Sequence, residues 1–301
     1  MKQQYNRLPD AILKAKNREI AVFSTEGENI DHSVVVSFGE EWLKFQDYDD
    51  ETIEKFVREY FDILSDQMVN KGSYAADIGC GTGRWSKYLS TRAGFIEAID
   101  PSDALYAADN LLGNIENIRL TKASTETIPF PDETFDFAMS VGVLHHIPDT
   151  QKAMMDCVRK VKKGGYFYTY LYYNLDNRGF LFKFIFWISN GVRKIVSRMP
   201  AGIKRFACDL LAGTIYLPIV WLIRFMYWIG AGKLADKLPL NSYKNKNFFV
   251  LRNDALDRFG TKLEHRFSRK QVIVMMENCG LDNIVIGPGV PFYHAVGRRK
   301  S

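Results

Sequence analysis

The chain has 301 residues, 47% of them hydrophobic and 14% aromatic, which is enough for one large domain or one domain with a substantial insertion. Its four cysteines are far apart without a C-x-x-C pair, so the sequence supports no zinc site, and free thiols favour a reducing, cytoplasmic compartment. The net charge of +5 is uneven, because residues 178–250 contain twelve Lys or Arg and only two Asp. The first 20 residues are mixed and charged and lack the apolar core of a secretory signal.

Residues 1–70 are predicted to form an N-terminal helical segment that includes a lid. Within it, residues 37–45 place Trp42 and Phe45 in an acidic setting. Two interpretations are open: a helix that packs these aromatics into the core, or a segment that closes over a ligand. Apolar residues spaced three or four apart then predict a helix from Glu51 to Met68.

Three glycines alternate in a turn that directly follows an apolar run ending at Asp77. Gly79, Gly81 and Gly83 can take positive φ and let the backbone lie close to a ligand. A strand entering a helix through such a turn is where doubly wound sheets bind cofactors. The spacing excludes the dinucleotide fingerprint G-x-G-x-x-G, because the third position falls on Arg84 or Ser86 rather than on glycine.

Short apolar runs alternate with helical segments after this turn, which is typical of a parallel sheet. The first of these runs, 95–99, ends in Asp100, and an acidic residue at that strand tip can accept hydrogen bonds from both hydroxyls of a ribose. The later segments are 117–130, 135–149 and a Gly164-Gly165 turn before 166–170.

These segments, taken in order from about residue 73 to 175, resemble the motifs of the class I S-adenosylmethionine-dependent methyltransferases, of the type 11-like kind. Asp77-x-Gly-x-Gly-x-Gly83 is similar to motif I, 117–130 to the third strand and adenine loop, and 135–149 to motif IV. Segments similar to residues 37–42 precede the cofactor domain in such enzymes and close over cofactor or substrate.

The resemblance implies an α/β fold: a Rossmann-like, doubly wound, mostly parallel seven-stranded sheet with an antiparallel last strand. The core is expected at 71–175, a helical cap insertion after strand five at 176–250, and completion of the sheet by 251–301. The last two strands are predicted at 284–286 and 292–296.

The resemblance also implies S-adenosylmethionine as the cofactor, with no metal. Ser124 stands where the adenine loop usually begins with aspartate, and a hydroxyl is the weaker, neutral acceptor. Lys163 stands where a proline is usual before strand five. The residues expected to bind the cofactor are Asp77, Gly79, Cys80, Gly81, Gly83, Asp100, Pro101, Ser102, Ser124, Thr125, Ser140 and Val141.

Two histidines follow the fourth core strand, beside the expected methyl group. Methyl transfer is an in-line displacement, so much of the catalysis can come from positioning the nucleophile. An acceptor hydroxyl would also need a base, for which His145 and His146 are the candidate catalytic residues. The other interpretation is that they pack or orient the loop. His146 matches the more regular histidine of the family.

The insertion combines basic and apolar residues. Residues 210–223 lack charge but are fewer than the roughly 20 needed to span a bilayer, and Pro218 interrupts them, which favours a buried or interfacial helix. Residues 180–198 predict an amphipathic helix with a basic face, typical of a membrane-surface helix and equally of a lid over an apolar pocket. The charge balance favours peripheral contact with an anionic inner membrane face.

The acceptor is the least determined part of the prediction. The polar segment 252–267 resembles a segment of methyltransferases from bacterial cell-surface polysaccharide clusters, and its side chains form either a sugar site or a solvated salt-bridge network. The leading hypothesis is a small-molecule acceptor: a hydroxyl or amine of a sugar or of a lipid-linked glycan precursor. The alternatives are a lipid or quinone and, less favoured, RNA, because the aromatics of the basic segment are mixed with long aliphatic residues. The residues considered for sugar binding are Asp254, Asp257, Arg258, His265 and Arg266.

Overall fold

The computed structural model describes residues 2–44, 50–175, 179–289 and 293–301. The chain divides into two compact units: Met1–Asp176 with Leu263–Ser301, and Asn177–Lys262. The helical insertion therefore extends twelve residues beyond the predicted end at 250, because helix α10 (Phe248–Gly260) packs on α7 (Ala201–Leu211) within the second unit.

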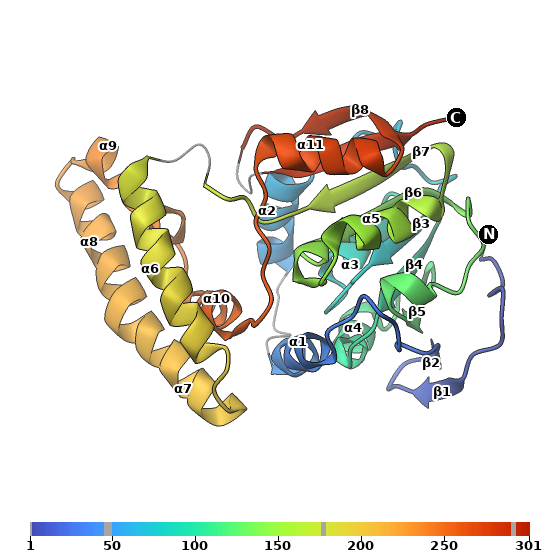
Figure 1. Ribbon diagram of the computed structural model, residues 1–301, viewed down its shortest axis with the longest axis horizontal. Helices are drawn as coiled ribbons and strands as arrows, with labels where there is room; N and C mark the ends of the chain where they lie inside the picture. The colour runs from blue at the N-terminus through green and yellow to red at the C-terminus, as the bar shows by residue number, and fades with distance from the viewer. Residues whose placement is uncertain (1, 45–49, 176–178, 290–292) are drawn as a thin grey trace. The chain divides into compact units, whose positions relative to one another are not determined.

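The first unit is built on a mixed sheet whose seven core strands have the order β5-β4-β3-β6-β7-β9-β8 (Figure 1). The first five of these strands are mutually parallel, and β9 is antiparallel to both β7 and β8. This confirms the predicted Rossmann-like class and its antiparallel last strand. The strands are β3 (Tyr74–Ile78), β4 (Phe95–Asp100), β5 (Ile118–Lys122), β6 (Phe135–Val141), β7 (Val161–Tyr170), β8 (Leu281–Ile286) and β9 (His294–Arg299).

An N-terminal hairpin adds two strands, so the sheet has nine strands among the described residues rather than the predicted seven. β1 (Ala11–Lys14) pairs antiparallel with β2 (Glu19–Val22), and β2 continues the sheet in parallel beside β5. Ile20 and Phe23 are fully buried there. The prediction of a helical segment is wrong for these residues, because a four-residue strand is too short for a period of two to show in the sequence.

Helices cover both faces of the sheet. Alternate residues of a strand point to opposite sides, so neighbouring residues of β3 belong to different core clusters. Ala76 and Ile78 belong to one core cluster, with α5 (Thr150–Arg159) and α11 (Arg269–Asn278). Ala75 belongs to the other, with α3 (Arg84–Ser90) and α4 (Ala104–Leu112).

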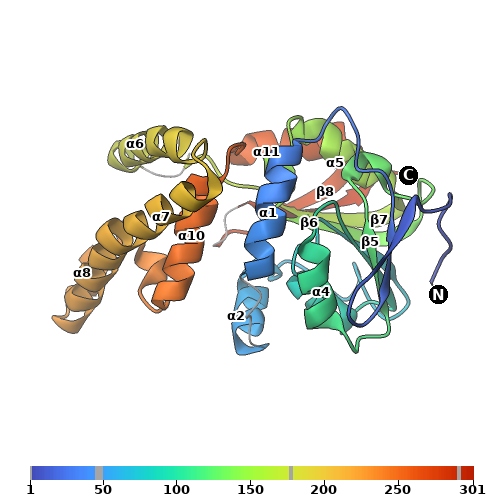
Figure 2. The same ribbon diagram turned by 90° about the horizontal axis from the view of Figure 1, so that it is seen from below.

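Two helices precede the core of the sheet. α1 (His32–Lys44) packs along α4 (Figure 2). α2 (Asp50–Tyr60) ends eight residues before the predicted end at Met68, because the chain turns after Tyr60. Phe45, one of the two aromatics of the predicted lid, lies outside the described residues.

The second unit is helical. α7 continues through a π-turn (Ala212–Tyr216) into α8 (Leu217–Trp228), so the uncharged run 210–223 belongs to a longer helix than its length suggested. Within the described ranges, Gly202–Trp228 is one helix that is long and apolar enough to cross a membrane by length and composition, and 28% of its apolar window is buried. The other helices in the described part of this unit are α6 (Phe180–Val196), α9 (Gly232–Ala235), the 3-10 helix η4 (Asn241–Tyr243) and α10.

Candidate cofactor and acceptor site

The glycine turn joins β3 to α3 at the carboxyl end of the sheet. Gly79 and Gly83 have φ values of 79° and 80°, which strain any residue with a side chain. A Cβ at Gly79 would lie 2.5 Å from Cγ2 of Val143, and one at Gly83 would lie 2.6 Å from Cδ1 of Leu112. The alternating glycines are therefore required by the backbone and by packing, and they keep the loop close to its neighbours.

Asp100 ties the tip of β4 to this turn. Its carboxylate accepts hydrogen bonds from the Gly81 N–H at 2.9 Å, the Ser102 N–H at 2.8 Å and the Ser102 hydroxyl at 2.6 Å. Burial raises the pKa of Asp100, and the donors from Ser102 and Gly81 oppose that shift. Hydrogen bonds to a carboxylate favour its charged form, so these three donors act against the effect of burial.

Asp77 is a second buried carboxyl, at the centre of the sheet. One oxygen accepts a 2.6 Å hydrogen bond from the Ser86 hydroxyl, while Oδ1 has no hydrogen-bond partner among the described residues. Burial raises the pKa of Asp77 to about 7, with the Ser86 hydroxyl opposing the shift and Asp100 adding to it. Two buried carboxyls beside a glycine turn suit a cationic ligand, and S-adenosylmethionine carries a sulfonium and an ammonium.

The remaining residues expected at the cofactor lie at or just beyond the carboxyl ends of adjacent strands. Ser124 caps the short helix η1 (Thr125–Thr127), where its hydroxyl lies 3.1 Å from Thr127 Oγ1. Ser140 donates a 2.8 Å hydrogen bond to the Ile78 carbonyl and so links β6 to β3. Burial raises the pKa of the Cys80 thiol well above its usual value, so this residue is a neutral thiol. Pro101, Thr125 and Val141 are half-buried or buried at the same strand ends.

Helix α1 covers the glycine turn. A Cβ built on Gly81 would meet the Trp42 indole nitrogen at 3.5 Å. The Arg84 guanidinium lies 5.0 Å from the Trp42 ring and 4.7 Å from the Trp85 ring. Phe38, one turn earlier on α1, lies 4.8 Å from the His146 ring. The sequence interpretation did not assign Arg84 or Phe38, although Arg84 directly follows the last glycine of the motif.

The two histidines occupy different environments after β6. His145 is fully buried and stacks on Tyr172 with ring centroids 3.9 Å apart, and neither of its ring nitrogens has a hydrogen-bond partner among the described residues. Burial lowers the pKa of His145 well below its usual value, and His146 adds to the shift, so the ring is neutral.

His146 is oriented by a backbone carbonyl. Its Nδ1 lies 2.7 Å from the oxygen of Leu263, 117 residues away in the chain. A carbonyl can only accept a hydrogen bond, so Nδ1 carries the proton and Nε2 is the basic nitrogen of the ring. Of the two predicted catalytic histidines, His146 has the tautomer that a proton acceptor needs.

The polar segment 252–267 is divided between the two units. Asp254, Asp257 and Arg258 lie on α10 of the second unit, whereas His265 and Arg266 lie in the first. The His265 N–H donates to the His145 carbonyl at 2.9 Å. The Arg266 guanidinium lies 5.1 Å from the Tyr172 ring. The residues considered for sugar binding therefore do not gather in one unit.

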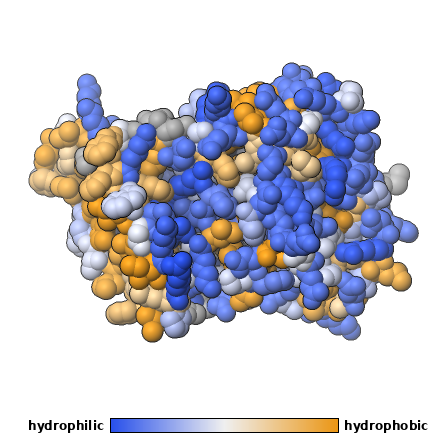
Figure 3. All heavy atoms as spheres, in the orientation of Figure 1, coloured by the Kyte–Doolittle hydropathy of each residue, from blue (hydrophilic) through white to orange (hydrophobic). Residues whose placement is uncertain are grey.

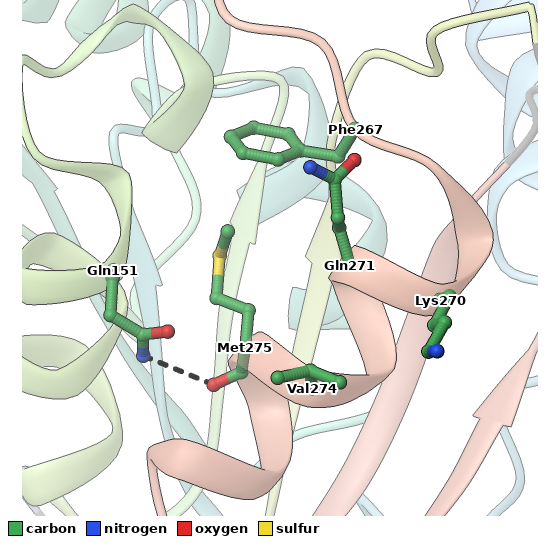
Figure 4. Close-up of a pocket in the computed structure, with 6 residues that line it drawn as sticks. All are labelled: Gln151, Phe267, Lys270, Gln271, Val274 and Met275. Carbon is green, nitrogen blue, oxygen red and sulfur yellow. Dashed lines mark hydrogen bonds between the residues drawn. The ribbon is translucent and has the colours of Figure 1, made fainter.

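A shallow cavity lies between α5 and α11, away from the predicted cofactor residues (Figure 4). Gln151 donates a 3.1 Å hydrogen bond to the Met275 carbonyl across its floor. None of its lining residues belongs to the glycine turn or to the ends of β4 and β6. The lining consists of Gln151, Phe267, Lys270, Gln271, Val274 and Met275.

Comparison with known proteins finds a match to a methyltransferase domain in the part of the chain that forms β3 to β7. Residues 76–169 match a family model described as a methyltransferase domain. The chain is 32% identical over 116 residues to a demethylmenaquinone methyltransferase of Geobacillus sp. (strain WCH70), covering 35% of this chain and 47% of that protein. It is 32% identical over 107 residues to a demethylmenaquinone methyltransferase of Staphylococcus aureus (strain JH9), covering 34% and 44%.

The chain thus spans less than half the length of these curated relatives. Among solved structures, it is similar to a SAM-dependent methyltransferase of Aquifex aeolicus, with a TM-score of 0.44, 16% identity and coverage of 83% of this chain and 98% of that one. The domain match confirms the prediction of a methyltransferase domain, for which S-adenosylmethionine is the cofactor.

Proposed function

We propose that this chain, which carries a methyltransferase domain over residues 76–169, transfers the methyl group of S-adenosylmethionine to a small acceptor carried by a lipid. The observation that carries the proposal is the helical unit, which exposes large apolar and aromatic side chains within a strongly basic segment. A lid for a water-soluble sugar needs neither feature. The isoprenoid quinone and the lipid-linked glycan precursor both satisfy this description, and the curated relatives favour the quinone.

The residues at the strand ends would hold the cofactor. When bound, it supplies a methyl group on a sulfonium, which is a good leaving group. Asp100 would accept hydrogen bonds from the ribose, Ser124 and Thr125 would lie at the adenine, and Asp77 would face the cationic end. Gly79, Gly81 and Gly83 let the backbone approach, and Trp42 on α1 excludes water from the turn.

His146 would act on an acceptor hydroxyl. Because Leu263 holds the proton on Nδ1, Nε2 can take the proton that the hydroxyl loses as the methyl group is transferred. His145, neutral and stacked on Tyr172, would support the position of that ring.

We also propose that the protein works from the cytoplasmic side, in peripheral contact with the inner membrane face. Cys80, Cys157 and Cys208 are buried free thiols, which suits a reducing compartment. An excess of Lys and Arg next to apolar helices suits an anionic membrane surface.

A methyl-transfer assay with labelled S-adenosylmethionine tests the proposed function. The acceptors are a demethylated quinone in its reduced hydroquinone form and a lipid-linked sugar, both in vesicles, a water-soluble sugar and RNA. We expect transfer to one of the two lipid-borne acceptors and none to the others. If the water-soluble sugar were methylated as fast as the lipid-borne acceptors, the proposal that the acceptor is carried by a lipid would be overturned.

Asp100→Ala is the matched loss-of-cofactor variant for this assay. It should weaken S-adenosylmethionine binding in calorimetry by about 1–3 kcal/mol, because charge-assisted hydrogen bonds are lost. Asp103→Ala, whose side chain is 58% exposed three residues later, should bind as the wild type does. Unchanged affinity in a folded Asp100→Ala protein would remove Asp100 from the site.

A further inference from the structure

One face of the continuous helix α7–α8 exposes apolar side chains in two stretches, 203–210 and 221–228. They recur at intervals that keep to one side of a helix, while Cys208, Ala212, Tyr216 and Val220 on the other side belong to the core of the helical unit. Trp228 is 81% exposed and Phe206 is 69% exposed. We name this surface the α7–α8 stripe; it consists of Ile203, Phe206, Leu210, Trp221, Phe225 and Trp228.

Helix α6 carries a second stripe of the same kind. Phe180, Phe184 and Trp187 form a ladder of stacked rings with centroids 6.3 Å apart at each step, and Trp187 is 70% exposed. Figure 3 shows apolar side chains gathered over the helical unit, over α6 and α8. Exposed apolar patches of this extent mark a surface that binds a partner or a membrane.

Basic side chains flank both stripes, and their acidic neighbours are already paired. Asp209 forms a 2.6 Å ion pair with Arg252, and Asp236 accepts a hydrogen bond from Tyr227. The exposed cations on or just after α6 and in the segment after α8 are Lys183, Lys194, Arg198, Lys233 and Lys237. No ion pair within the described residues involves these five cations, and apolar and aromatic residues together with such cations match the interface of an anionic bilayer.

The packing of α10 on the helix α7–α8 favours one orientation of that helix relative to the bilayer. α10 lies on α7 and on the π-turn at the middle of the long helix, and it carries Arg252, Asp254, Asp257 and Arg258. The helix spans about 40 Å at 1.5 Å per residue, so a transmembrane orientation would place its middle, with these charged groups, in the hydrocarbon. Charged side chains at that depth are costly, whereas a helix lying in the membrane plane leaves them in water.

We infer that the helical unit, residues 177–262, is a monotopic anchor: the α7–α8 and α6 stripes lie in the plane of an anionic membrane interface and no helix crosses it. This inference rests on the proposed function, because it names the surface that brings the site to a lipid-borne acceptor. The occupant of the stripes is the bilayer itself.

Vesicle binding by the full chain is the first test. We expect binding to vesicles of phosphatidylcholine with phosphatidylglycerol to be at least about tenfold tighter than to phosphatidylcholine alone, and to weaken as salt rises. The triple variant Trp221→Ser, Phe225→Ser, Trp228→Ser should lose at least about tenfold in binding, because its apolar area no longer enters the interface.

The matched control is Leu8→Ser, Ile12→Ser, Val285→Ser, which removes three exposed apolar side chains from the first unit. It should bind vesicles as the wild type does. Equal loss in both triple variants, equal binding to neutral and anionic vesicles, or a stable dimer in ultracentrifugation that ignores vesicles would overturn the inference.

Labelling of the helix ends tests the in-plane orientation. Gly202→Cys, where a Cβ meets no atom within 4 Å, and the exposed position Lys233→Cys lie near opposite ends of the helix. In spheroplasts of an expression host, an impermeant maleimide should label neither cysteine until the cells are lysed, and then both. Labelling of one end in intact spheroplasts would show a crossing helix.

The two proposals fail separately. Vesicle binding without methylation of any lipid-borne acceptor would overturn the proposed function and leave the anchor standing. Methylation of a detergent-solubilised hydroquinone by a chain that does not bind vesicles would overturn the anchor alone.

Discussion

Two buried carboxyls, Asp77 and Asp100, lie at neighbouring strand ends. Asp100 receives three hydrogen bonds from protein donors, which stabilise its charge, whereas Asp77 receives one and has an unpartnered oxygen. The sequence could place both at strand ends next to a glycine turn. It could not show that burial raises the pKa of both, or which donors oppose that shift at each, because burial and the donors depend on the folded chain.

Asp77 should contribute to the pH dependence of stability, together with Asp254, whose pKa burial raises to about 6. Because burial raises the pKa of Asp77 from 3.8 to about 7, the folded state keeps a proton that the unfolded state releases between those values. The free energy of unfolding should therefore fall as pH rises from about 4 to 7, by as much as ~4 kcal/mol from this group, and then level off.

Asp77→Asn should remove the contribution of this group, because an amide has no proton to lose. Urea unfolding of variant and wild type at pH 5 and pH 8 should show the variant gaining relative stability at pH 8. Asp66→Asn, at a side chain that is 87% exposed, is the control and should show no such gain. A constant difference between Asp77→Asn and wild type at both pH values would contradict the raised pKa.

The histidines should separate by function. His146→Gln should lower kcat by about 10²–10⁴-fold with unchanged cofactor affinity if Nε2 is the base for an acceptor hydroxyl. His145→Phe retains a neutral ring against Tyr172 and should keep most of the rate. Steady-state rates give kcat, and calorimetry on the same preparations gives the affinity for the cofactor. Full activity of His146→Gln would leave the pair with a structural role.

At the scale of elements, α1 turns the strand ends into a covered site. Trp42 lies against Gly81 and the Arg84 guanidinium, and Phe38 lies against His146, so one helix contacts both the cofactor turn and the predicted base. The motif spacing allowed either a lid or simple core packing for Trp42. Trp42 is half-buried over the glycine turn, which favours the hypothesis that it belongs to a lid.

Trp42→Ala tests that role. Loss of the indole should weaken S-adenosylmethionine binding by about 1–2 kcal/mol, because water would reach the turn and the cation–π contact with Arg84 would be lost. Val36→Ala, an exposed position on the same helix, should bind normally. A lower melting temperature with unchanged affinity would mean that Trp42 only packs.

At the scale of the whole molecule, our proposals assign the chemistry to one unit and membrane attachment to the other. The first unit contains the sheet, both carboxyls and both histidines, and the second contains the exposed apolar stripes and the surplus of cations. The uneven charge distribution was visible in the sequence. The end of the helical unit at Lys262 was not, because α10 is polar enough to resemble a connecting segment until its contacts with α7 are known.

The sequence by itself determined the parallel core, the glycine turn and Asp100 at the second core strand, because these features depend on local periodicity and on short, fixed spacings. Only the tertiary structure decided the partners that are distant in the chain. The N-terminal hairpin joins β5 about a hundred residues away, and the Leu263 carbonyl selects the tautomer of His146 across 117 residues. Local patterns do not encode such pairings, since each arises when the sheet and its surrounding segments pack together.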